Sequence, residues 1–281
     1  MTVTDAELSS LAASHDIISV GVAADEARRQ RHGARTTFVR VADVDAAPGE
    51  PIVIPPSAGE VRIVGVPASP DAAVQRVRDV VAAAGAVPVS AFSLADLEQL
   101  AAANQMPLRR LLEDLRQAGL ELVAQAPFDK LRDARLAIEE VNIAGLGLAR
   151  LTIDTLPTAD AAALYRQVAA VQQAVGFIKA FAPLPRHVNP AVPTTGYDDV
   201  RRVALARLFV PNIPSIQVDW SLYGPKLAQV ALTVGADDID GVSSLDDAAE
   251  GRRRAPLEEI RRNILAAALE PIERDGRFDA R

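Results

Sequence analysis

Three polar residues, Gln217, Asp219 and Ser221, alternate with apolar residues in the stretch 215–221, which also contains Trp220. The alternation predicts a strand whose side chains point in turn to two faces. If helices cover the outside of this strand, we expect Trp220 to pack among them and the polar face to point inward. A polar interior of this kind could hydrogen-bond a ligand such as a nucleoside. It could equally satisfy a basic partner from another strand.

A second set of polar residues follows the same rule. Arg150, Thr152 and Asp154 alternate along the stretch 149–155, and Lys179 lies in the next predicted strand, 177–182. We expect all four side chains to share the interior with Asp219. Buried charges need partners, so the set predicts either a ligand site or internal ion pairs.

Acid or base chemistry is conceivable for Asp219, Lys179 and His187, and His187 falls in the loop after the sixth predicted strand. No arrangement of nucleophile, base and acid is recognisable, so the catalytic residues stay unassigned. The aspartates at 237, 238 and 240 resemble a metal cluster, but neighbouring strand residues point to opposite faces. We therefore expect structural pairing or a helix cap there, and no metal site.

The elements that position these residues alternate regularly between strand and helix. Strands are predicted at 36–41, 61–65, 87–92, 120–124, 149–155, 177–182, 215–221 and 238–243. Short helices at 5–13 and 20–31 precede them, and a helix at 256–269 follows. Eight strand–helix units without a linker predict an α/β fold, a single (β/α)8 barrel of TIM type over residues 1–281, with a helical lead-in and a C-terminal helical extension.

Composition and net charge exclude several classes of function. A net charge of −7 argues against a nucleic-acid partner, because neutralising phosphates needs a basic surface. The chain contains no cysteine, which excludes disulfides, thiolate catalysis and a cysteine-ligated cluster. No signal-like segment and no apolar run of about 18 residues is present, so a cytoplasmic location without membrane contact is expected.

Four segments resemble a known family: GYDDVRRVALARLF, IQVDWSLYGPKLAQVAL, GADDIDG and the tail PLEEIRRNILAAALEPIERDGRF. They are similar to the radical-SAM enzymes of the futalosine menaquinone pathway, in particular the aminofutalosine synthase-like branch. Cyclic dehypoxanthine futalosine synthase and the deazaflavin-forming (FO) synthase are relatives. The resemblance spans nearly the whole chain and implies a radical-SAM-like barrel. It also aligns His187 with a histidine of the family's PL-x-x-H pattern.

The chain departs from this family where the cofactors bind. The family ligates a [4Fe–4S] cluster through Cys-x3-Cys-x2-Cys after the first strand, where this chain has the proline-rich loop 43–58. The glycine-rich segment after the fourth strand is replaced by Ala124-Gln125-Ala126-Pro127, and paired glycines after the second strand are reduced to Gly65-Val66. No cluster is therefore expected, and binding of S-adenosylmethionine is not expected either.

Three functions remain open. The first is a barrel without a cluster that binds a nucleoside- or futalosine-like small molecule, or that acts as an accessory protein partner of an active paralogue. The alternative is an enzyme with re-purposed, non-radical acid/base chemistry on a related metabolite. A purely structural subunit would be favoured if the loop 48–56 closed the mouth of the barrel.

Overall fold

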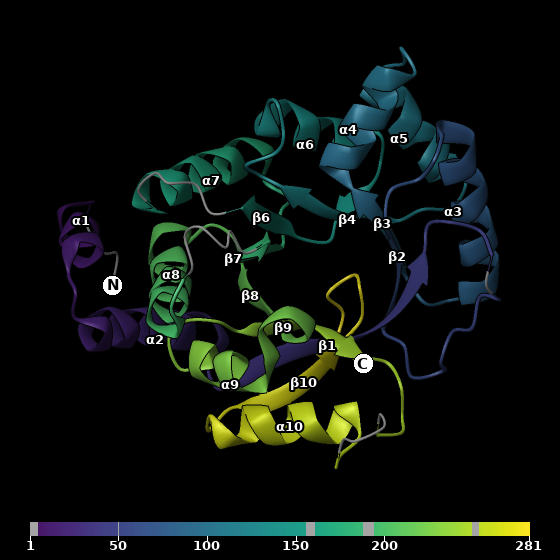
Figure 1. Ribbon diagram of the computed structural model, residues 1–281. Coiled ribbons are helices and arrows are strands. Elements are labelled where there is room, and N and C mark those ends of the chain that lie inside the picture. The colour runs from purple at the N-terminus through teal and green to yellow at the C-terminus, as the bar shows by residue number, and fades with distance from the viewer. Residues whose placement is uncertain (1–4, 50, 156–160, 188–193, 249–252) are drawn as a thin grey trace.

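A closed ring of parallel strands forms the centre of the computed structural model, which describes residues 5–49, 51–155, 161–187, 194–248 and 253–281 (Figure 1). Strands that occupy neighbouring positions in the ring pair with each other, and the last strand of the ring pairs back onto the first. The strands are β1 (Arg35–Asp45), β2 (Glu60–Val64), β3 (Val89–Ser93), β4 (Leu122–Pro127), β5 (Gly147–Leu148), β6 (Leu151–Thr155), β7 (Ala180–His187), β8 (Ser215–Asp219) and β9 (Asp238–Ser243). β5 and β6 together occupy the fifth position. The predicted (β/α)8 barrel is confirmed.

Helices cover the outside of the ring (Figure 1). They are α1 (Asp5–Ala13), α2 (Ile17–His32), α3 (Pro70–Ala84), α4 (Leu94–Ala103), α5 (Leu108–Gln117), α6 (Ala134–Ile143), α7 (Ala161–Val175), α8 (Gly196–Phe209), α9 (Trp220–Leu232) and α10 (Pro256–Ala266). The local sequence explains where several of these helices begin. Thr195 and Asp198 form a capping box at α8, and Ser69 accepts from the Ala72 amide ahead of Pro70 at α3. Residues 156–160, which precede α7, lie outside the described part of the chain.

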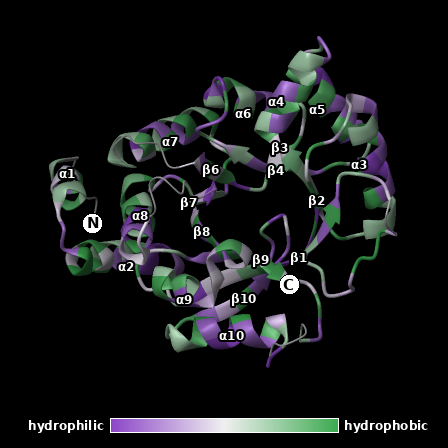
Figure 2. Cartoon of the chain, in the orientation of Figure 1, coloured by the Kyte–Doolittle hydropathy of each residue, from purple (hydrophilic) through white to green (hydrophobic). Residues whose placement is uncertain are grey.

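The hydrophobic core lies between the ring and the helices. Outward-facing strand residues such as Ile63, Ile216 and Ile239 are fully or almost fully buried there. Figure 2 shows hydrophilic and hydrophobic residues together on α3, α7 and α10, as expected for helices that bury one face. The inward faces of the strands carry charged residues instead, including Arg62 and Asp240. The barrel therefore has an apolar shell around a polar interior.

The C-terminal extension is not wholly helical, which corrects the prediction of a helix over 256–269. α10 ends at Ala266, and the strand β10 (Glu270–Arg274) follows and pairs in parallel with β1. β1 is long enough for two partners on one edge: residues 35–39 pair with β10 and residues 41–45 with β2. β10 thus occupies the part of β1 that β2 does not reach.

The tail after β10 crosses the end of the barrel where the strands begin. The guanidinium of Arg277 donates to the carboxylate of Glu121, just before β4, at 2.6 and 2.8 Å. The amide of Gly276 donates to the carbonyl of Gly59, and a Cβ on Gly276 would lie 3.1 Å from the Glu60 side chain. The tail therefore packs closely against the base of the barrel.

Two of the strand boundaries that differ from the prediction bear on the interior of the barrel. β1 continues through Asp45, so residues 43–45 are strand and not loop. β8 ends at Asp219, whose carboxylate accepts from the Leu222 amide and starts α9. Trp220 and Ser221 are therefore helical, and Trp220 is partly buried against the hydrophobic core. In the described part of the chain, none of the helices has the length and apolar character needed to cross a membrane.

Candidate ligand-binding site

A cavity of about 230 Å³ opens where the strands of the barrel end. We call it the mouth cavity. Catalytic and binding groups of (β/α)8 barrels gather at this face, because the loops that follow the strands meet there. The lining residues are Asp43, Arg62, Ile63, Val64, Gly65, Phe92, Ser93, Asp96, Ala124, Gln125, Arg150, Arg186, Asp219, Ser221 and Gly241. None of the described residues of the loop 48–56 is among them, so the structure gives no support for a mouth closed by that loop; residue 50 lies outside the described part.

Asp240 is the centre of the charge network below the mouth cavity. Its carboxylate accepts two hydrogen bonds from Arg62, at 3.0 and 2.8 Å, and one from Arg150 at 2.6 Å. The residue is only 1% exposed. Burial raises the pKa of Asp240, but Arg150 and Arg62 outweigh burial and hold this pKa well below its usual range. Arg62 also donates to Glu60, so these charges are paired inside the barrel.

Arg150 retains free hydrogen-bonding capacity. Only its Nη1 makes a hydrogen bond among the described residues, and its buried Nε has no partner there. Burial, together with the positive charge of Arg62, lowers the pKa of Arg150 to about 10 despite the neighbouring Asp240. The Oε1 atom of Gln125 is also buried without a partner in the described structure. Unpaired buried polar atoms are costly, so both residues favour a polar ligand or ordered water beside them.

Asp219 faces the mouth cavity, as predicted, but its oxygens are already engaged. They accept from Arg186 Nη1 at 2.6 Å, from Ser221 Oγ at 2.6 Å and from the Leu222 amide at 3.1 Å. Gly241 packs against this group with φ +70°, and a Cβ there would lie 3.0 Å from Asp219 Oδ1. Asp219 therefore positions Arg186 and Ser221 around the cavity.

Gln217 points inward but lies too deep to line the mouth cavity. Its Nε2 donates to Asp238 Oδ2 at 2.6 Å, and Asp238 also accepts from Arg274 Nε and Nη2, both at 2.7 Å. All three residues are buried. Thr152 is buried too and does not reach the cavity. These residues belong to a structural layer beneath the site.

The prediction that Lys179 shares the interior with Asp219 is wrong. β7 begins at Ala180, and Lys179 lies just before it, at the opposite end of the barrel from the mouth cavity. Its side chain is exposed there, and Nζ donates to the carbonyl of Arg277 at 2.7 Å. A residue that precedes a strand is far from the face where the strand ends.

Asp154 and His187 form a pair at the rim of the barrel. They lie at the ends of the neighbouring strands β6 and β7, and His187 Nδ1 lies 2.9 Å from Asp154 Oδ1. The His187 side chain is 75% exposed. Burial raises the pKa of Asp154, but hydrogen bonds from His187 and Lys130 outweigh burial and lower it. The residues that follow, 156–160 and 188–193, lie outside the described structure.

Two carboxylates of the mouth cavity, Asp43 and Asp96, were not singled out from the sequence. Neither makes a hydrogen bond or an ion pair within the described residues. Burial raises the pKa of Asp43 against the opposing charge of Arg62. Burial also raises the pKa of Asp96, with a further contribution from Asp154. Carboxylates in a cleft with raised pKa values and no partner are typical of groups that contact a ligand.

The aspartates at 237, 238 and 240 have the structural role that was predicted for them. Each pairs with an arginine: Asp237 with Arg207, Asp238 with Arg274, and Asp240 with Arg62. Among the described residues, no group of three or more histidine, cysteine, aspartate or glutamate side chains could hold a metal ion.

The residues around the mouth cavity include no thiolate that could ligate the [4Fe–4S] cluster of a radical-SAM enzyme. A [4Fe–4S] cluster takes thiolate ligands, and the chain has no cysteine. The charged side chains at the cavity are arginines and aspartates, and Gln125-Ala126-Pro127 forms the end of β4 where the family has glycines.

Sequence comparison identifies relatives with known names. Residues 181–281 match the CofH/MqnC C-terminal region. Aminodeoxyfutalosine synthase of Thermus thermophilus is 28% identical over 225 residues, which cover 68% of this chain and 60% of that protein. Cyclic dehypoxanthine futalosine synthase of Streptomyces coelicolor is 25% identical, covering 68% of this chain and 54% of that protein. The 5-amino-6-(D-ribitylamino)uracil–L-tyrosine 4-hydroxyphenyl transferase of Archaeoglobus fulgidus is 35% identical, covering 39% and 35% respectively. The chain thus spans 60% or less of the length of these relatives.

Solved structures share the fold. Methylornithine synthase (PylB) superposes with a TM-score of 0.68 at 13% identity, over 96% of this chain and 94% of that one. The [FeFe]-hydrogenase maturase HydG superposes with a TM-score of 0.64 at 12% identity, over 95% and 71%. These likenesses concern the barrel alone. By sequence, this cysteine-free chain is thus similar to aminodeoxyfutalosine synthase and cyclic dehypoxanthine futalosine synthase over part of their length, and its residues 181–281 match the CofH/MqnC C-terminal region.

Proposed function

We propose that this protein binds a nucleoside-like small molecule in the mouth cavity and performs no radical chemistry on it. The observation that carries the proposal is a cavity lined by both signs of charge in which Asp43 and Asp96 have no partner among the described residues. The names of the relatives suggest the class of ligand, since two are named as synthases of futalosine derivatives and one as a transferase between a ribityl uracil and tyrosine. The chain has no cysteine to ligate the [4Fe–4S] cluster on which the radical chemistry of the similar enzymes depends.

The cavity offers complementary groups to such a ligand. Asp43 and Asp96 can accept hydrogen bonds from amino or hydroxyl groups, and Arg150 and Ser221 can donate to carbonyl or ring nitrogen atoms. A nucleoside presents both kinds of group. The volume of about 230 Å³ is slightly below the roughly 300–1,000 Å³ of typical small-molecule pockets. One end of the ligand would therefore occupy the cavity while the other lies at the open mouth.

A thermal-shift series tests this proposal, because a ligand that binds only the folded state raises its melting temperature. The probes are aminodeoxyfutalosine, cyclic dehypoxanthine futalosine and 5-amino-6-(D-ribitylamino)uracil. We expect at least one of them to stabilise the wild type, and this stabilisation to disappear in Asp43→Asn. The matched control is Asp71→Asn, which changes an exposed carboxylate in the first turn of α3. Equal shifts in both variants, or no shift with any probe, would overturn the proposal.

A role as accessory partner of an active paralogue is compatible with the same site. Three apolar side chains are exposed near the mouth: Val64 at 38%, Val66 at 65% and Leu222 at 48%. An apolar rim around a polar cavity would suit a protein that receives or delivers the ligand. Size-exclusion chromatography of this protein mixed with a cysteine-bearing paralogue tests the idea. Co-elution that Leu222→Asp abolishes would support it, and separate elution of the wild type would reject it.

The second candidate function is non-radical acid/base chemistry, and the Asp154–His187 pair favours it. A carboxylate on Nδ1 orients a histidine ring and leaves Nε2 to exchange a proton with a substrate. If this pair is catalytic, turnover of a bound probe should vanish in His187→Gln, while probe affinity stays within about threefold. Binding without any chemical change of the probes would reject this candidate and leave the binding function intact.

A further inference from the structure

A second cavity, of about 490 Å³, lies at the opposite end of the barrel from the mouth cavity. We call it the basal cavity. It falls within the roughly 300–1,000 Å³ of small-molecule pockets. It lies among the end of α2, the start of β1, the segments before β7 and β8, and the C-terminal tail. The lining residues are Arg31, His32, Arg35, Thr37, Lys179, Pro214, Ser215, Asp237 and Phe278.

The basal cavity has an excess of positive charge. Arg31, Arg35 and Lys179 line it beside His32, and Asp237 is the one acidic side chain in the lining. Asp237 is 2% exposed; its Oδ1 accepts from Arg207 and from the Ile216 amide, and its Oδ2 lies 3.4 Å from His32 Nε2. Arg31, Arg35 and Lys179 make no ion pair within the described residues. The cations would therefore attract an anion into the cavity.

The pKa of Arg207, a buried residue next to the cavity, is consistent with this positive charge. Burial lowers the pKa of Arg207 despite Asp237, and the nearby charges of Arg31 and Arg28 lower it further. Arg28 is itself completely buried. Both guanidinium groups behind the wall are paired with carboxylates, Arg207 with Asp237 and Arg28 with Asp25, so the excess positive charge comes from the lining itself.

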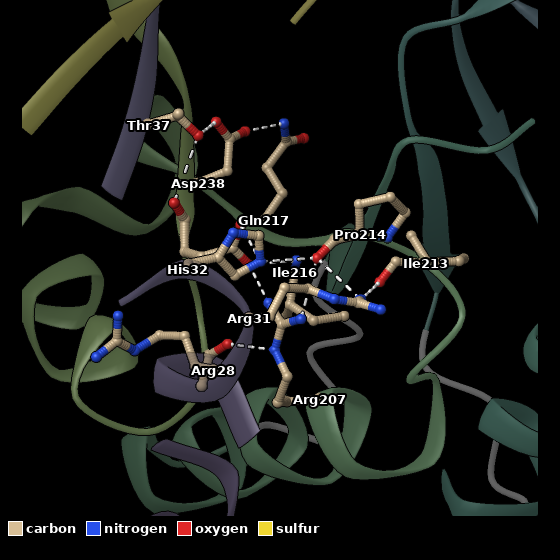
Figure 3. Close-up of polar contacts among 12 residues, drawn as sticks. Arg28, Arg31, His32, Thr37, Arg207, Ile213, Pro214, Ile216, Gln217 and Asp238 are labelled. Atoms are coloured by element: carbon tan, nitrogen blue, oxygen red, sulfur yellow. Dashed lines mark hydrogen bonds and ion pairs between the residues drawn. The ribbon is translucent and has the colours of Figure 1, made fainter. Parts of the chain in front are cut away.

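The fold holds some of these cations in place and leaves others free. Arg31 donates to the carbonyls of Ile213 at 2.9 Å and Pro211 at 2.7 Å, and His32 Nε2 lies 3.0 Å from the Pro214 carbonyl. Figure 3 shows both side chains directed at this segment before β8. Arg35, by contrast, makes no hydrogen bond or ion pair within the described residues and is exposed.

Lys179 and the tail complete the wall. Lys179 Nζ donates to the Arg277 carbonyl at 2.7 Å and keeps two further protons for another acceptor. It also lies 5.9 Å from the centroid of the Phe278 ring. Phe278 has a φ of +69°, which is uncommon for a residue with a side chain, and it places an aromatic surface beside the cations. The guanidinium of Arg274 lies 3.8 Å from the centroid of the same ring, and Phe278 is half-buried, so the cavity combines free donors with the part of the ring that stays exposed.

We propose that the basal cavity binds a small organic molecule through its phosphate group, with the body of the molecule against Phe278. A phosphate carries nearly two charges and several acceptor oxygens, which suits the guanidinium of Arg35 and the ammonium of Lys179 together. The chemistry of (β/α)8 enzymes takes place at the other face, so a ligand here binds without reacting. The proposal does not depend on what occupies the mouth cavity.

Isothermal titration with pyrophosphate and with adenosine monophosphate tests this inference. We expect saturable binding to the wild type, and at least tenfold weaker binding to Arg35→Gln and Lys179→Gln. Arg35 has no partner to lose among the described residues, so the melting temperature of Arg35→Gln should equal that of the wild type. Arg110→Gln is the matched control, because it removes an exposed arginine on α5.

Asp43→Asn supplies the control for location, since Asp43 lines the mouth cavity and not the basal one. It should leave phosphate binding unchanged. The proposal is overturned if neither probe binds, if Arg110→Gln weakens binding as much as Arg35→Gln does, or if Asp43→Asn abolishes binding. The last result would place the phosphate in the mouth cavity.

Discussion

Arg150 donates to Asp240 across 2.6 Å inside the barrel, and both residues are almost completely buried, at 3% and 1% exposed. Arg150 follows β5, and Asp240 lies on β9. The pair therefore links two separated parts of the ring beneath the mouth cavity. This hydrogen bond holds in place the guanidinium of Arg150, which we expect to contact the ligand.

Replacement of Asp240 by alanine should destabilise the protein by about 3–5 kcal/mol, because it leaves Arg62 and Arg150 buried without their shared carboxylate. Urea unfolding at neutral pH measures the loss. Asp114→Ala is the control, since it breaks an exposed ion pair with Arg110 that contributes no more than about 1 kcal/mol. A loss for Asp240→Ala no larger than for the control would show that the network does not stabilise the barrel.

Asp43→Asn, in contrast to Asp240→Ala, should stabilise the folded protein. The pKa of Asp43 is raised in the folded protein, so its charged form is disfavoured there relative to the unfolded chain. The charged carboxylate therefore lowers the free energy of unfolding at pH values above that pKa. This loss disappears as the pH falls through the pKa and Asp43 becomes protonated. Asn at this position should raise the melting temperature at neutral pH while it weakens ligand binding. A lowered melting temperature would indicate a structural role for Asp43.

The raised pKa of Asp43 also predicts how binding depends on pH. An amino group on the ligand would pair with the carboxylate, so affinity should fall as the pH decreases through that pKa, which lies above the ordinary pKa of an aspartate. Asp43→Asn should remove this part of the pH dependence. Titrations of wild type and variant across the acidic range provide the comparison, and identical profiles would contradict the assignment.

The backbone at Gly241 leads to a separate prediction. Gly241→Ala should cost about 1–3 kcal/mol, because alanine is strained at φ +70° and its Cβ would approach Asp219 Oδ1 to 3.0 Å. Gly196→Ala is the matched control, since nothing lies within 4 Å of the added Cβ and α8 begins there. Chemical denaturation of both variants gives the comparison. Equal stabilities would mean that the contact with Asp219 is not tight.

Iron–sulfur reconstitution is expected to fail. Without thiolate ligands, anaerobic incubation with iron and sulfide should leave no stoichiometric cluster and no cluster absorption band after desalting. A cysteine-bearing relative treated in parallel shows that the procedure works. A cluster retained by this protein would contradict the expectation.

The sequence was sufficient to predict the barrel, because the alternation of strands and helices is a local periodic signal. It also placed Asp219 and Arg150 at the interior correctly. It did not reveal Asp43 or Asp96, because one was assigned to a loop and the other lies on a helix. Lys179 was misplaced for a related reason: alternation gives the face of a strand, but not which end of the barrel a residue occupies. β10 was missed because its pairing depends on the free part of the β1 edge.

Calorimetric titration of the wild type with aminodeoxyfutalosine, cyclic dehypoxanthine futalosine and 5-amino-6-(D-ribitylamino)uracil tests the central claim most directly. The account predicts one-to-one binding of at least one of them. It also predicts that Asp43→Asn weakens this binding by about 1–3 kcal/mol, the usual loss when a hydrogen-bond partner is removed, while Asp71→Asn leaves it unchanged. Binding that is equally strong in all three proteins would place the ligand outside the mouth cavity and contradict the account.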